Sequence, residues 1–313
     1  MTKSFSAKVK EELSRLKFTK NEQLLAEIGA FAFSCGNIKL TRKGVSLVCF
    51  CENEDVILRQ IAIIKRLYGA SPQLVATEKV QPKKHTSYSF EVHFASEYGK
   101  LLFDIGLLGG SIEDYSFGQI NKDVYFSDEC FFASLRGAFL GCGVLTDPNK
   151  KYLLEFVLSN EEFANLLLEK LNENGFFAKM NSRAERNVIY IKKIEHISDI
   201  LISIGATNAM MDIESIRVFK DVKNTINRED NCMIGNMSKT ITASQRQIRE
   251  INALLSAKIK LAPALSEACE LRLANPDTSL SALAEISGIS KSALNKRFIK
   301  IHEAFVDLEG RNL

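Results

Sequence analysis

The chain has 313 residues, of which 46% are apolar and 25% are charged, and its formal net charge is +3. This composition can fill two or three globular cores and excludes a collagen-like or largely disordered chain. A charge this small means that any affinity for nucleic acid must come from local basic patches.

The sequence also bears on the compartment. No apolar stretch approaches the ~20 residues that a membrane-spanning helix needs, and the start MTKSFSAKVKEEL has no signal-peptide core. The seven cysteines are odd in number and lie mostly in apolar runs. We therefore expect a multidomain cytoplasmic protein without a membrane partner.

The first part of the chain alternates predicted helices and strands. Residues 5–16 form an amphipathic lead helix, since Phe5, Val9 and Leu13 recur at helical spacing. The pattern then predicts a helix ending at Cys35, strands over 38–40 and 45–50, a helix over 55–67, strands over 73–79 and 87–94, and a helix from Ser96. The glycine-containing run 105–110 lacks the strand-then-helix context of a dinucleotide-binding loop, so we expect a helix end and a turn there.

The same order of elements returns after Asp128. The predicted elements are a helix ending at Cys142, a strand over 152–158, a helix over 160–174, strands over 176–181 and 188–192, and a helix over 195–204. The interval from Cys35 to Cys142 gives a repeat period of about 107 residues. The sequence thus predicts an α+β pseudo-dimer of two αββαββα repeats, with a lead helix over 1–20, repeat 1 over 21–115 and repeat 2 over 116–222.

Beyond Thr207 we expect no further strands. A helix is predicted over 208–219, and the polar, Asn-rich run 224–239 fits a linker, which we place at 223–240. Helical patterns return over 242–260, over 264–274 and from Leu280 onward. These patterns predict an all-α domain over 241–313.

Residues 280–301 fit a helix-turn-helix. Ala284 is small where the two helices would touch, Gly288 occupies the turn, and Ser290 is a favourable N-cap. The expected apolar contacts are Leu283, Ile286, Ile289, Leu294, Phe298 and Ile301.

The second helix of this motif has the composition of a recognition helix, with no acid before Glu303. We expect the side chains near its N-terminus to meet base edges, namely Lys291, Ser292 and Asn295. We expect the others to meet phosphates, namely Lys296, Arg297 and Lys300. A helical hairpin whose lysines only face solvent is the alternative.

The run SLRGAFLGCG, residues 134–143, resembles the LAGLIDADG helix of homing endonucleases. Leu135, Gly137 and Gly143 match that motif, but its two acidic positions hold Leu140 and Cys142. A looser copy, IGAFAFSCG over 28–36, has Cys35 before its final glycine. Since Mg²⁺ prefers oxygen ligands, both repeats lack the metal-binding acid, and we expect no nuclease activity, metal or cofactor.

Small residues recur near both Cys-Gly pairs, and they suit two helices that cross closely at the pseudo-twofold axis; ordinary helix packing is the alternative. They are Gly29, Ala30, Gly137, Ala138 and Gly141.

A second basic candidate lies between two predicted strands, in residues 79–85. Lys83 and Lys84 there could touch a DNA backbone from a hairpin, although a solvated hairpin tip fits equally well. The counterpart in the second repeat, residues 182–186, is only weakly basic. Cys49 and Cys51 fit structural cysteines, and the four histidines have no metal-ligand spacing.

Taken together, these motifs resemble the WhiA family, the sporulation and cell-division regulators of Gram-positive bacteria. The resemblance rests on SFSAKVKEEL near the start and on residues 136–156, 227–240 and 290–297. It implies a degenerate LAGLIDADG domain tethered to a C-terminal helix-turn-helix. It also implies a nucleoid-associated protein that binds double-stranded DNA in transcription control, cell division and chromosome segregation. The family usually has His where Leu153 and Lys296 stand, so the roles of those histidines are not implied here.

Two other classes of function remain open on the sequence. An active homing endonuclease or intron maturase would need one acid per repeat, and Asp147 is the only nearby carboxylate that could substitute. A protein-interaction scaffold would use the LAGLIDADG-like body to bind another transcription regulator, such as a sigma factor.

Overall fold

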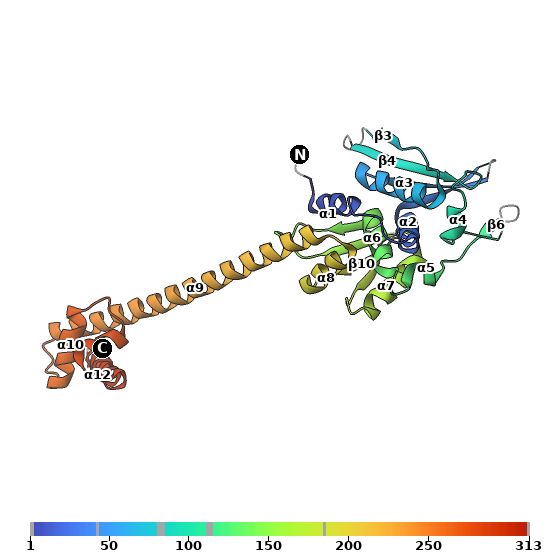
Figure 1. Cartoon of the computed structure of the whole chain (residues 1–313). Coiled ribbons are helices and arrows are strands. Elements are labelled where there is room, and N and C mark those ends of the chain that lie inside the picture. Colours follow the sequence, from blue (N-terminus) through green and yellow to red (C-terminus); the bar gives the residue numbers. More distant parts are fainter. Residues whose placement is uncertain (1–2, 42–43, 80–84, 111–114, 184–185, 312–313) are drawn as a thin grey trace. The chain divides into compact units, whose positions relative to one another are not determined.

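The computed structural model describes residues 3–41, 44–79, 85–110, 115–183 and 186–311 (Figure 1). The chain divides into two compact units, Met1–Val218 and Phe219–Leu313, and each is described by itself.

The first repeat of unit 1 follows the lead helix α1 (Phe5–Ser14). It contains α2 (Asn21–Cys35), β1 (Gly36–Thr41), β2 (Gly44–Cys51), α3 (Glu54–Tyr68), β3 (Val75–Lys79) and β4 (His85–His93). The four strands form one antiparallel sheet in the order β1-β2-β4-β3. Asn53 caps α3 by accepting a hydrogen bond from the Asp55 amide, and Gly69 ends it with φ of 77°.

The second repeat has the same plan. It contains α6 (Phe131–Cys142), β7 (Gly143–Leu145), β8 (Leu154–Leu158), α7 (Glu161–Glu173), β9 (Lys179–Arg183), β10 (Arg186–Ile191) and α8 (Ile194–Ile204). Its sheet order, β7-β8-β10-β9, repeats that of the first sheet. The predicted α+β fold with two LAGLIDADG-like repeats is therefore confirmed, although the sequence had not indicated the three-residue strand β7.

The connection between the repeats differs from the prediction. The helix expected from Ser96 is only α4 (Leu101–Asp104), and Ser96 itself lies in turns. The glycine-containing run after α4 leads into a small hairpin, β5 (Leu108–Gly110) with β6 (Tyr115–Phe117), which is followed by α5 (Lys122–Phe126). Gly106 has φ of 74°, a conformation that favours glycine and turns the chain into β5.

Helices α2 and α6 pack directly on each other at the centre of unit 1. A Cβ atom added to Gly137 would lie 2.1 Å from the Glu27 carbonyl oxygen, and one on Gly141 would lie 2.8 Å from the Ser34 Cβ. Gly137 and Gly141 are thus required by the close contact with α2, as expected, whereas a Cβ on Gly29 would meet the Tyr125 side chain of α5. Both repeats contribute to one continuous apolar core around this helix pair.

A buried ion cluster joins the two repeats beside these helices. The Glu27 carboxylate accepts hydrogen bonds from Arg59 of α3 and from Arg136 of α6, and all three side chains are at most 10% exposed. In addition, Arg59 Nη1 donates to the Leu16 carbonyl oxygen, and Arg136 Nη1 donates to the Ile204 carbonyl oxygen. The cluster therefore links the lead segment, α2, α3, α6 and α8.

Unit 2 contains most of α9 (Thr207–Ser256), together with α10 (Pro263–Ala274), α11 (Leu280–Ser287) and α12 (Lys291–Arg311). The predicted linker 223–240 is helical throughout, so the expectation of a break between helices was wrong. Polar residues such as Asn cost a helix less than about 0.7 kcal/mol each, and α9 contains no proline. A solvent-exposed helix can therefore continue through this polar composition. Every helix in the described parts of the chain is either too short or too polar to span a lipid bilayer.

Candidate nucleic-acid interface

The helix-turn-helix of unit 2 forms through local capping. Ser279 begins α11 by accepting a hydrogen bond from the Ala282 amide, and Gly288 ends it with φ of 65°. Ser290 then caps α12 by accepting from the Ala293 amide at 3.2 Å. Gly288 and Ser290 have the roles that the sequence predicted, and together they fix a short turn between the two helices.

The apolar side of the motif packs into the core of unit 2. Leu283, Ala284, Leu294, Phe298 and Ile301 are buried. The prediction for Ile286 was wrong, because this side chain is 59% exposed. At 100° per residue, Ile286 is about 60° from Leu283 but about 160° from Ala284, so it lies at the margin of the buried side of α11.

A buried arginine of α10 connects the helix-turn-helix to the rest of unit 2. The Arg272 side chain of α10 donates to Gln247 Oε1 at 2.9 Å and to the Thr278 carbonyl oxygen at 2.6 Å. Its guanidinium also lies over the Phe298 ring, 5.5 Å from the centroid. These contacts join α9, the segment before α11, and α12, so Arg272 helps to position α12. The sequence analysis missed it; the signal available was an arginine within the apolar run of α10.

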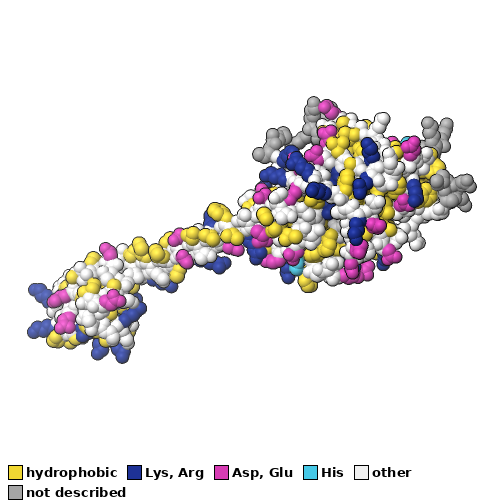
Figure 2. All heavy atoms as spheres, in the orientation of Figure 1, with side chains coloured by type: hydrophobic (Ala, Val, Ile, Leu, Met, Phe, Trp, Pro, Cys, Tyr) yellow, Lys and Arg dark blue, Asp and Glu magenta, His cyan; other side chains and the backbone are white. Residues whose placement is uncertain are grey.

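The outer side of α12 is polar and accessible. Lys291, Ser292, Asn295, Lys296 and Lys300 are all exposed. Figure 2 shows Lys and Arg side chains protruding from the surface of unit 2. Five of the six predicted contact residues on this helix are thus available to a ligand.

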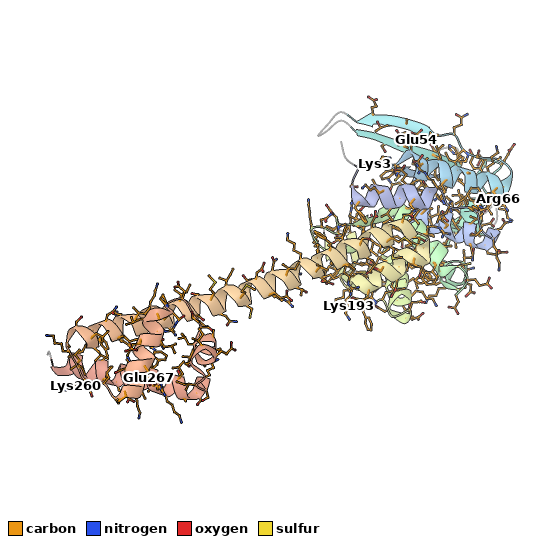
Figure 3. The ribbon with its side chains drawn as sticks, turned by 60° about the vertical axis from the view of Figure 1, so that its left-hand side comes forward. Lys3, Glu54, Arg66, Lys193, Lys260 and Glu267 are labelled. Carbon is orange, nitrogen blue, oxygen red and sulfur yellow. The ribbon has the colours of Figure 1, made fainter. Side chains whose placement is uncertain are left out.

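Arg297 differs from the other five. Its guanidinium is 3.2 Å from the Glu267 carboxylate and its side chain is only 24% exposed. Glu267 lies on α10 (Figure 3). A phosphate would have to displace this ion pair, so Arg297 is less suited to DNA contact than the sequence suggested.

Ile299 is an exposed apolar residue on the same outer side of α12, 49% accessible and four residues after Asn295. An apolar side chain in this place can contact a thymine methyl group. Charge and polarity, which mark the other exposed residues of α12 in the sequence, do not mark Ile299.

The two degenerate acid positions lie where the LAGLIDADG motif predicts, at the C-terminal ends of the paired helices. Cys35 ends α2 and Cys142 ends α6. Burial, and next the neighbouring Cys49 thiol, raise the pKa of Cys35 well above its ordinary value, and burial raises the pKa of Cys142 to about 12. Both thiols are therefore neutral near pH 7, and neither supplies the negative oxygen that Mg²⁺ requires.

A cavity of about 1420 Å³ lies against these helix ends and is also lined by Lys10 of α1. Its described carboxylates, Glu52, Glu54 and Asp55, all come from the first repeat. Within the described residues, no group of three or more His, Cys, Asp or Glu side chains is arranged to hold a metal ion. The arrangement lacks the paired acids of a two-repeat nuclease site.

Two other candidates can also be placed. Asp147 lies in the turn after β7, where its Oδ1 accepts hydrogen bonds from the backbone and side-chain nitrogens of Asn149 at 2.9 and 3.0 Å. Lys83 and Lys84 lie outside the described residues, between β3 and β4.

Comparisons with known proteins agree with this architecture. Residues 131–223 match the family model for the WhiA LAGLIDADG-like domain, and residues 226–305 match the model for the WhiA C-terminal HTH domain. The chain is 34% identical to the "Probable cell division protein WhiA" of Clostridium tetani, covering 97% of this chain and 98% of that protein. It is also 34% identical to the protein of the same name from Thermoanaerobacter sp. (strain X514), covering 99% of each.

Solved structures show the same fold. The crystal structure of full-length DUF199/WhiA from Thermotoga maritima matches with a TM-score of 0.60 at 23% identity, covering 97% of this chain and 99% of that chain. The N-terminal LAGLIDADG domain of DUF199/WhiA matches with a TM-score of 0.53 at 22% identity, covering 69% of this chain and 98% of that chain. Full-length identity of this level to curated relatives, with both domain models matched in order, shows that the chain belongs to the WhiA family.

Proposed function

We propose that this protein is a sequence-specific DNA-binding transcription regulator that acts in cell division and chromosome segregation, and in sporulation where that occurs. The observation that carries the proposal is the outer side of α12, where five polar or cationic side chains are exposed. Arg272 helps to hold the helix-turn-helix that presents them in place through its contact with Gln247. A helix of this kind fits the major groove and presents its first turns to base edges. Such a protein would be cytoplasmic and nucleoid-associated.

The residues of α12 divide by chemistry in this proposal. Asn295 carries an amide that can pair with the edge of an adenine, and Ser292 and Lys291 lie close to it at the helix N-terminus. Lys296 and Lys300 carry charges that neutralise phosphates. Arg297 would join them only after leaving Glu267.

Substitution of Asn295 and of Lys296 by Ala tests this division. Asn295→Ala should weaken binding to the preferred site by about 1–3 kcal/mol and relax base preference at one position. Lys296→Ala should weaken binding to all duplexes alike and reduce the slope of log affinity against log salt by about one unit. Salt titrations on the preferred and a scrambled duplex measure both effects. Equal losses on both duplexes for both variants would contradict major-groove reading by α12.

We also propose that the protein does not cut DNA, because neutral thiols stand at both acid positions. Incubation with Mg²⁺ or Mn²⁺ and a plasmid carrying the bound site should leave the plasmid supercoiled. Gel electrophoresis over time measures nicking. Metal-dependent nicking that Asp147→Ala abolishes would contradict this proposal and support the nuclease alternative.

A further inference from the structure

The middle of α9 carries an apolar stripe that unit 2 leaves uncovered. Successive members are three, four, seven, one and three residues apart, which places all six on one side of the helix. Each is between 50% and 70% exposed: Phe219, Val222, Ile226, Met233, Ile234 and Met237. We call this set the α9 stripe, and Figure 2 shows hydrophobic side chains along this helix.

The α9 stripe continues a side of the helix that is buried further on. Ser244 and Ile251 follow Met237 at intervals of seven residues and are 2% and 0% exposed in the core of unit 2. This side of α9 is therefore a packing surface from Ser244 onward. It keeps apolar residues toward the N-terminus, in the α9 stripe, where the side chains are exposed. Single exposed apolar residues are common, but six that gather on one side of one helix mark an interaction surface.

From these observations we propose that the α9 stripe binds the α9 stripe of a second copy of this chain, with the two helices antiparallel. The surface area that such a contact would bury supports a second copy as the partner. Burying six such side chains on each copy removes on the order of 1,200 Å² from water, which reaches the lower limit of a stable specific interface.

Charges decide the direction of the two helices. Asp230 lies within the row, four residues after Ile226, and Glu229 is beside it. A parallel pair in register would set Asp230 against Asp230, which is unfavourable. An antiparallel pair with its twofold axis at Ile226 and Asn227 instead sets Lys223 of each copy against Asp230 of the other.

The apolar side chains fit the same antiparallel register. Ile226 then lies next to Ile226 of the second copy at the axis, and Phe219 lies against Met233 and Ile234 of the second copy. A groove of about 800 Å³, lined by Met233, Asn236 and Met237 among others, adjoins this place. Phe219, 70% exposed in the single chain, is a side chain of suitable size to enter it.

Sedimentation velocity on the full chain, from about 1 to 100 μM, tests the proposal. The chain should form a dimer with a Kd in the micromolar range. Ile226→Lys should abolish the dimer, because it places two cations at the axis. Circular dichroism should show unchanged helix content, since Ile226 is half exposed in the single chain.

A charge exchange tests the direction. Asp230→Lys and Lys223→Asp should each raise the dimer Kd about tenfold or more, and the double variant should return it close to the original value. Asp221→Lys is the matched control: it makes the same charge change at an exposed position on the opposite side of α9, and it should leave the Kd unchanged.

A monomer throughout the concentration range would overturn the proposal and leave the stripe to a different partner. A dimer insensitive to Ile226→Lys would overturn it as well. A double variant no tighter than either single variant would overturn the antiparallel arrangement. None of these measurements involves DNA, so their outcome is independent of the proposed function.

Discussion

Glu27→Gln is expected to lower the free energy of unfolding of unit 1 by about 3–5 kcal/mol, the usual cost of breaking a buried ion pair by removing one partner. The Glu27 carboxylate is 0% exposed, and the Arg59 and Arg136 side chains beside it are 1% and 10% exposed. One carboxylate thus serves two buried cations. Its loss leaves both guanidinium groups without a counter-ion in a region that water does not reach.

The hydrogen bonds of this cluster use both oxygens of the Glu27 carboxylate. Arg59 donates to both carboxylate oxygens, at 2.6 and 3.0 Å, and Arg136 Nε donates to Glu27 Oε2 at 2.8 Å. Glutamine keeps the shape of the side chain, but it replaces one of these acceptors by an amide group that can only donate.

Urea unfolding followed by circular dichroism measures the effect. Glu11→Gln is the matched control, because Glu11 also contacts two cations, Lys3 at 2.6 Å and Arg15 at 2.5 Å, but on the surface. This control should leave stability almost unchanged, since solvent screens such pairs. Equal midpoints for the two variants would show that the buried cluster contributes no more than a surface pair.

The contribution of Glu27 should also depend on pH. Burial alone would raise the pKa of this carboxyl, but the hydrogen bonds and charges of Arg59 and Arg136 outweigh burial and hold its pKa below the ordinary value. The stabilisation is then fully present above the unfolded pKa of about 4.3 and is lost as the pH falls through the folded pKa. The difference in stability between the original chain and Glu27→Gln should therefore shrink in acid below pH about 4.

Removal of unit 2 is expected to reduce affinity for the specific DNA site by about a thousandfold or more, to the level of non-specific binding. A chain of residues 1–218 keeps the whole core of unit 1 and should fold, whereas it loses every candidate contact residue of α12. Electrophoretic mobility shifts at a fixed salt concentration, on specific and scrambled duplexes, measure the loss.

The complementary chain of residues 219–313 serves as the control. It has a separate apolar core formed by α9 to α12, so it should fold and keep the preference for the specific duplex. If residues 1–218 retained specific binding, the base contacts would lie in unit 1, and the assignment to α12 would be wrong.

Much of the fold could be predicted from sequence because its signals are local. The repeat was visible in the alternation of helix and strand patterns, and Gly288 and Ser290 marked the turn of the helix-turn-helix. The three-residue strands β5, β6 and β7 are too short to show alternation. The course of α9 was missed because its polar composition suits a linker and a solvated helix equally.

Residues that act over long sequence distances were the hardest to find. Arg136 meets a carboxylate 109 residues away, and Arg272 meets Gln247 25 residues away. No spacing rule connects such pairs, because the fold alone brings them together. The exposed polar residues of α12 were predicted correctly as a group, since helical periodicity separates them from the buried side. Which of them touches a base stays a prediction.

The Glu27 cluster also means that the two repeats are no longer interchangeable. With the 107-residue offset that relates Cys35 to Cys142, Ser134 corresponds to Glu27, and Gly29 corresponds to Arg136. Ser134 is fully buried, its hydroxyl has no hydrogen-bond partner among the described residues, and a Cβ on Gly29 would meet the Tyr125 hydroxyl. A protein assembled from two copies of the first repeat would hold two acids without Arg136, and one assembled from two copies of the second would hold two arginines without an acid. The dependence is one-sided, because Glu27 keeps Arg59 of its own repeat as a counter-ion, whereas Arg136 finds its carboxylate only in the other repeat.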